Sequence, residues 1–130
     1  MPFLSTWVHE PYILKTYFSG RVSGSELKVS MLEYLGAAQT QPMYFMMDFL
    51  DADGVPNEML NMPAILQVIN HANTRWLILV KQESASSYMT QLLSRDKVKT
   101  YRDRETALAF LRAMVRIDTG EILEKKAEKS

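Results

Sequence analysis

Apolar and polar positions follow two different periodicities along this chain, and together they predict strands that alternate with helices. Two short runs rich in β-forming residues, Thr6–Glu10 and Tyr12–Phe18, open the chain and are separated by Pro11. Continuous apolar runs at Met43–Phe49 and Trp76–Val80 are typical of strands that are covered on both faces, as in parallel sheets. The first pair therefore predicts a hairpin, and the later runs predict central strands.

The first helical segment follows the hairpin. Ser23 and Glu26 have the spacing of a capping box, in which each side chain bonds the free backbone N–H of the other. The helix is expected to end near Gln39–Gln41, ahead of Pro42, because the residue before a proline disfavours helical geometry. Its apolar stripe is predicted to contain Leu27, Met31, Leu35 and Ala38, with Leu32 and Tyr34 beside it.

Three further helices and one short strand are predicted in the rest of the chain. One helix is expected to begin near Asn61, or to kink there, and to run to about His71. Ser84 can cap the next helix. Val98–Tyr101 predicts a short strand, and Asp103 can cap the last helix. The apolar face of that helix is predicted to contain Ala107, Leu108, Leu111, Met114 and Val115.

The resulting order is β-β-α-β-α-β-α-β-α, which predicts an α/β fold. Strands that alternate with helices imply a mostly parallel central sheet, and the opening hairpin adds an antiparallel edge to it. The expected fold thus has one such sheet with about four helices in residues 1–117. Residues 118–130 lose the apolar periodicity and alternate in charge, so they predict a flexible C-terminal tail.

Composition narrows the function classes. The 15 basic residues balance the 15 acidic ones, so no net charge attracts nucleic acid. The absence of cysteine excludes disulfides and thiolate chemistry. Met1–Trp7 does not resemble a signal peptide, and no apolar run reaches the roughly 20 residues of a transmembrane helix. A cytoplasmic protein that binds neither nucleic acid nor cofactor is expected.

Three local features, in this order, resemble the SpoIIAA-like or STAS domains of bacterial anti-sigma-factor antagonists. The first is the hairpin that runs through Phe18–Ser23 into the capped helix. The second is the apolar strand Tyr44–Phe49, which contains Asp48 near its end. The third is Val98–Leu111, where a short strand ends in an aromatic residue and an acidic cap opens an Ala/Leu-rich helix. The resemblance covers about residues 5–116 and implies a non-enzymatic regulatory module whose partner is a protein, such as a kinase or an anti-sigma-like regulator.

The regulatory serine of that family has no counterpart here. Family members present Asp-Ser-(Ser/Thr)-Gly after the central strand, and phosphorylation of the serine breaks the complex. The corresponding stretch is Asp51–Asn57, and no serine or threonine occurs from Gln41 through Asn73. Asp53 is expected to act either as a fixed negative charge in place of the phosphate or simply as a residue that favours a helix start.

The predicted binding surface is the loop after the central strand together with the helix that follows it. Its candidate residues are Asp51, Asp53, Gly54, Val55, Asn57, Met59, Leu60, Met62 and Ile65. A protein partner or a second copy of the chain, forming a homodimer, is the main expectation. The alternative is a small apolar, lipid-like ligand under the methionine-rich helix, although methionines also serve as ordinary core filling.

Enzymatic chemistry has weaker support in the sequence. The segment Asp51–Val55 resembles the nucleophile motif of haloacid-dehalogenase-like phosphatases, which would use Asp51 and Asp53 with Mg²⁺. Phe49 and Leu50 separate that motif from the aspartate of the strand, and the later acidic pair of that family is missing. Asp48, Asp51 and Asp53 are expected either to hold a cation loosely or to face water. The basic residues from Arg95 to Arg104 interleave with acids and predict a solvated face. No catalytic residue and no metal ligand is assigned.

Overall fold

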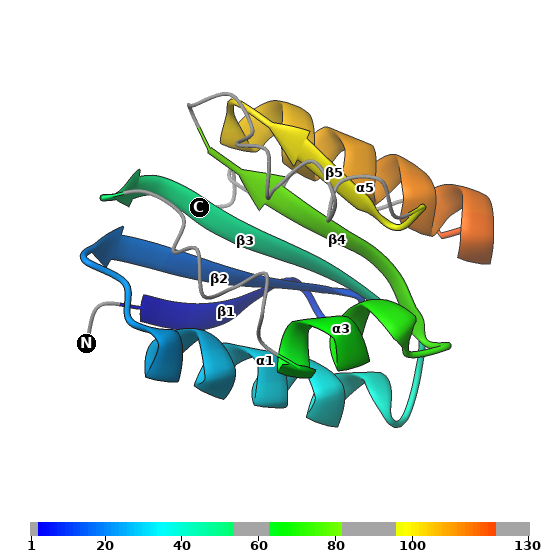
Figure 1. The fold of residues 1–130 in the computed structure, drawn as a ribbon. Coiled ribbons are helices and arrows are strands. Elements are labelled where there is room, and N and C mark those ends of the chain that lie inside the picture. Colours follow the sequence, from blue (N-terminus) through cyan, green and yellow to red (C-terminus); the bar gives the residue numbers. More distant parts are fainter. Residues whose placement is uncertain (1–2, 54–62, 82–95, 122–130) are drawn as a thin grey trace.

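A five-stranded sheet forms the centre of the computed structural model, which describes residues 3–53, 63–81 and 96–121 (Figure 1). The strands lie side by side in chain order: β1 (Phe3–His9), β2 (Ile13–Gly20), β3 (Met43–Ala52), β4 (Thr74–Val80) and β5 (Val98–Tyr101). β1 pairs antiparallel with β2, and every later pair is parallel. The predicted hairpin followed by a parallel sheet is confirmed.

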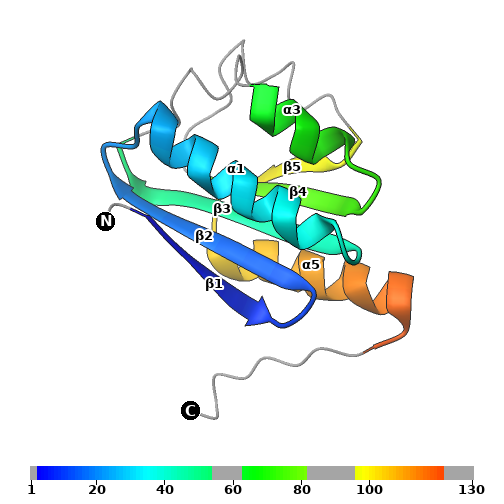
Figure 2. The ribbon, with the colours of Figure 1, turned by 90° about the horizontal axis from the view of Figure 1, so that it is seen from below.

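Three helices are described, and they cover the two faces of the sheet unequally. α1 (Gly24–Ala38) and α3 (Pro63–Asn70) lie on one face, whereas α5 (Arg104–Thr119) lies on the other (Figures 1 and 2). Each face has its own apolar cluster, and all of Met43–Phe49 is buried between them. This burial on both sides explains why β3 reads as a continuous apolar run.

The start of α1 follows the predicted capping box. Ser23 Oγ accepts a hydrogen bond from the backbone N–H of Glu26 at 3.2 Å, and the Glu26 carboxylate accepts one from the Ser23 N–H at 2.8 Å. Two otherwise unpaired donors of the first turn are thereby satisfied. The hydrogen bonds between Ser23 and Glu26 therefore fix the residue at which α1 begins after β2.

The buried stripe of α1 contains Tyr34 in place of the predicted Leu35, and it also contains Ser30. Tyr34 is fully buried, whereas Leu35 is only partly buried. The Tyr34 ring stacks on Phe45 at 4.1 Å between centroids, and its hydroxyl donates to the Met46 carbonyl at 3.1 Å. Burial raises the pKa of Tyr34, so the neutral hydroxyl is the form held in the core. A satisfied hydroxyl lets a tyrosine replace leucine there.

β3 is longer than predicted because of its pairing with β2. β3 continues to Ala52 rather than ending at Phe49, because Ser19 and Gly20 of β2 pair with Asp51 and Ala52. Asp51 therefore belongs to a strand and not to the predicted loop.

α5 continues to Thr119, beyond the predicted start of the tail at residue 118. It ends at Gly120, whose φ of +82° favours glycine and whose N–H bonds the Arg116 carbonyl at 2.8 Å. Residues 122–130, the predicted helix after Ser84 and the predicted helix start near Asn61 lie outside the described residues.

Candidate functional site

The carboxyl-terminal edge of β3 carries a buried acidic group. Asp48 is fully buried, and one of its carboxylate oxygens accepts the Leu50 N–H at 3.0 Å. Its other oxygen is paired with Nε of Arg104, the first residue of α5. Asp103 caps this helix by accepting the Thr106 N–H at 2.8 Å, which sets the point at which Arg104 leaves the backbone. A buried carboxylate therefore has both a cation and a backbone donor.

Arg104 also reaches the exposed carboxylate of Asp51, three residues further along β3. Its Nη2 lies 3.0 Å from Asp51 Oδ2, and the Tyr17 hydroxyl donates to the same oxygen at 2.6 Å. The guanidinium stands 5.8 Å from the centre of the Tyr17 ring. The Tyr17 hydrogen bond, followed by Arg104, lowers the pKa of Asp51, and the hydrogen bond from Arg104 to Asp48 raises the pKa of Arg104. In this network one guanidinium and one phenol hydroxyl hold two carboxylates, so a net negative charge remains.

Asp53 lies directly beyond this network and is exposed. Its backbone N–H bonds the Gly20 carbonyl at 2.8 Å, so the chain remains attached to the end of β2 at this point. Asp51 and Asp53 therefore place two carboxylates at the carboxyl-terminal end of the central strand, β3. This is the edge at which open α/β sheets place their sites.

The other predicted binding residues divide into two groups. Ile65 is described and lies fully buried in the cluster beneath α3, so it supports the surface rather than forming it. The remaining candidates lie outside the described residues and stay predictions: Gly54, Val55, Asn57, Met59, Leu60 and Met62.

Arg104 is the residue of this site that sequence reasoning missed. The interleaved charges around it predicted a solvated face, but its side chain is 39% exposed and joins Asp48 to Asp51. The available signal was its position directly after the Asp103 cap, because the helix that follows β5 begins at the same edge where β3 ends. That signal becomes visible only when the parallel order of the strands is known.

The positive charge that lies between Asp48 and Asp51 is the guanidinium of Arg104. Among residues 3–53, 63–81 and 96–121, no group of three acidic or histidine side chains is arranged to hold a metal ion. In a phosphatase of the kind considered above, an oxygen of Asp51 would attack phosphorus; here its Oδ2 accepts hydrogen bonds from both Tyr17 and Arg104. The chemistry that this geometry supports directly is presentation of fixed negative charge.

Comparison with known proteins identifies the fold. The chain is similar to the crystal structure of an uncharacterised protein of the DUF3478 family from Shewanella loihica PV-4, described as having a SpoIIAA-like fold. The TM-score is 0.57 at 14% sequence identity, over 84% of this chain and 93% of the other. No protein-family model matches the sequence, and no curated protein matches it. The fold is therefore SpoIIAA-like, as the sequence predicted. None of the described helices combines the length and hydrophobicity of a membrane-spanning segment.

Proposed function

We propose that this chain is a non-enzymatic, STAS-like interaction module whose protein-contacting surface is the carboxyl-terminal edge of β3. The observation that carries the proposal is the fixed position of the exposed Asp51 carboxylate, which Arg104 and Tyr17 hold against the buried Asp48. A charge held in place before binding loses little freedom when a partner docks. Asp53, one step further along the same edge, extends the acidic surface.

The partner best suited to this edge is a protein with a basic contact surface. Charge complementarity of this kind contributes mainly to specificity and to the rate of association. A second copy of this chain is the alternative occupant, and it would have to bring a basic region of its own to the edge. The cytoplasm stays the predicted compartment.

Regulation by phosphorylation of this segment is not part of the proposal. The chain has no serine or threonine from Gln41 through Asn73, and Tyr44, whose hydroxyl is the one side-chain hydroxyl in that stretch, is buried. Asp53 would then act as a permanent negative charge where related modules add a phosphate. The module is expected to remain in one binding state.

Site-specific crosslinking in the native cell tests the surface. A photo-crosslinking amino acid replaces Asp53 in one variant and Lys28, which is exposed on α1, in a matched control. We expect a discrete covalent adduct with a protein from position 53 and none from position 28. An adduct of twice the chain mass would identify a second copy. Equal adducts from both positions, or none from position 53, would contradict the proposed surface.

The absence of a switch has its own test. The purified chain is incubated with a lysate of the native cell and ATP, and its peptides are analysed by mass spectrometry. We expect no phosphate on any peptide within Tyr44–Asn70. Phosphorylation there would contradict the permanent-charge interpretation while leaving the location of the surface intact.

A further inference from the structure

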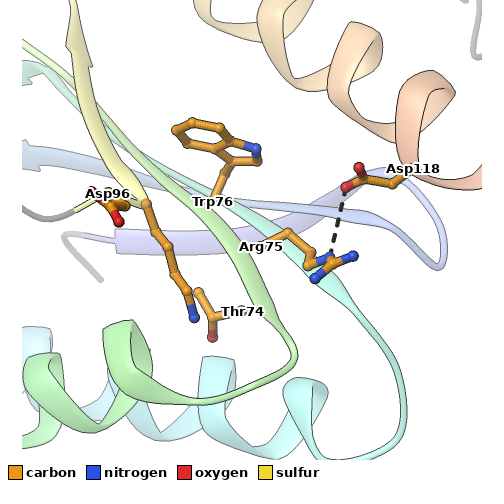
Figure 3. Close-up of a pocket in the computed structure, with 6 residues that line it drawn as sticks. Thr74, Arg75, Trp76, Asp96 and Asp118 are labelled. Atoms are coloured by element: carbon orange, nitrogen blue, oxygen red, sulfur yellow. Dashed lines mark ion pairs between the residues drawn. The ribbon is translucent and has the colours of Figure 1, made fainter.

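A small hollow lies at the amino-terminal ends of β4 and β5, at the opposite end of the sheet from Asp51. Its volume is about 290 Å³, and it is lined by Thr74, Arg75, Trp76, Asp96, Lys97 and Asp118 (Figure 3). Ligand pockets usually begin at about 300 Å³. This hollow therefore suits a small ligand or one end of a larger one.

Two cationic side chains face this hollow. Lys97 Nζ donates to the carbonyl oxygen of His71 at 2.9 Å, which uses one of its three donors, and it forms no ion pair with any described residue. Burial, and then the charge of Arg75, lowers the pKa of Lys97. Arg75 Nε lies 3.7 Å from Asp118 Oδ2, which is beyond hydrogen-bond distance. Arg75 therefore has a loose ion pair with Asp118, whereas Lys97 has no anionic partner among the described residues.

Thr74 adds a donor that has no partner among the described residues. The residue is fully buried, and within the described part of the chain its Oγ1 has no hydrogen-bond partner. Its backbone N–H bonds the same His71 carbonyl, at 3.1 Å, that accepts the Lys97 ammonium. That shared carbonyl ties Lys97 to the backbone of Thr74. A buried hydroxyl without a partner is unfavourable unless something else satisfies it.

The acidic residues at the rim limit the charge of the ligand. Asp96 and Asp118 lie on opposite sides of Trp76 (Figure 3). Two positive and two negative side chains leave the lining formally neutral. Both carboxylates repel any anion, and they repel a multiply charged phosphate more strongly than a singly charged carboxylate.

We propose that this hollow binds the carboxylate group of a small ligand through Lys97 and Thr74, with Arg75 adding positive charge. Among the described residues, two donors of Lys97 Nζ are unused, and Thr74 Oγ1 can donate one hydrogen bond. Trp76 also lines the hollow, and its ring packs against Phe110 of α5. The proposal is independent of the proposed function, because it concerns the opposite end of the sheet.

Titration followed by NMR tests the site. Sodium acetate is added to the full chain labelled with ¹⁵N, with sodium chloride keeping the ionic strength constant, and inorganic phosphate is titrated in parallel. We expect saturable shifts with acetate at the amides of Thr74–Trp76 and Lys97 and at the Trp76 indole N–H, and weaker binding of phosphate. No saturable response to acetate, or tighter binding of phosphate, would overturn the carboxylate site.

Variants separate a built site from general attraction of anions. Lys97→Met should weaken acetate binding at least about tenfold, because hydrogen bonds to charged groups are strong. Thr74→Val preserves the shape of the side chain and should weaken it several-fold. Lys28→Met removes the same charge from the far side of α1 and should leave the affinity unchanged. Acetate affinities that are equal in the Lys97→Met and Lys28→Met proteins would contradict the proposal.

Discussion

The two ends of the parallel strands both gather charged side chains, but they use them differently. At the carboxyl-terminal edge, Arg104 lies between Asp48 and Asp51, and each of these groups has a hydrogen-bonded partner. At the amino-terminal hollow, Lys97 has no ion pair among the described residues, and Thr74 Oγ1 has no hydrogen bond there. A network that satisfies itself stabilises the fold and presents a fixed surface, whereas unsatisfied donors favour an added ligand.

The largest effect is expected at the satisfied edge. Arg104→Met removes the cation from the fully buried Asp48, and we expect the free energy of unfolding to fall by about 3 kcal/mol. This value lies at the low end of the range for broken buried pairs because the Arg104 side chain is 39% exposed. Urea denaturation measures the change. Arg102→Met, at an exposed neighbour, should alter stability by no more than about 0.5 kcal/mol. Equal losses in the two variants would show that the network is not structural.

A smaller effect of opposite sign is expected at the hollow. Thr74→Val removes a buried hydroxyl that has no described partner, so the unliganded protein should become more stable by about 1 kcal/mol. Thr16→Val is the matched control. Thr16 is equally buried, but its Oγ1 bonds the Tyr34 hydroxyl at 2.7 Å and Ser5 Oγ at 3.0 Å. That variant should lose about 1 kcal/mol. Destabilisation by both substitutions would mean that Thr74 has a partner in the folded protein.

The smallest effect concerns acid stability. The Tyr17 hydrogen bond lowers the pKa of Asp51, and the Thr106 N–H lowers the pKa of Asp103. A folded-state pKa below the unfolded value of about 3.9 means that these groups stabilise the fold above that pH. The contribution is lost as the pH falls through the lower folded-state pKa. The Asp51→Asn, Asp103→Asn double variant should therefore show a flatter decline in unfolding free energy below pH about 4. A decline as steep as that of the unmodified protein would contradict this assignment.

Local patterns predicted most of the fold. The capping box at Ser23 and the Asp103 cap depend on residues three apart, and both form as expected. The apolar run of β3 depends on burial from both sides, which the short connections between strands and helices imply. These features are visible in sequence because each leaves a continuous local pattern of residues.

Features that depend on distant segments were not predictable in the same way. β3 reaches Ala52 because β2 is long enough to pair with it, and Tyr34 enters the core because Met46 offers a carbonyl. Arg104 pairs with Asp48, which is 56 positions away in the sequence. The hollow forms where β4, β5 and the end of α5 meet. The spacing of residues along the sequence does not show which distant side chains come into contact in the fold.

The assignment of protein contact to the carboxyl-terminal edge is tested most directly by probing both ends of the sheet in one experiment. A photo-crosslinking amino acid replaces Asp53 in one variant and Asp96, on the rim of the hollow, in another. Both chains are expressed in the native cell and irradiated, and their protein adducts are quantified by mass spectrometry. We predict a protein adduct from position 53 and none from position 96. An adduct from position 96 with none from position 53 would contradict the account.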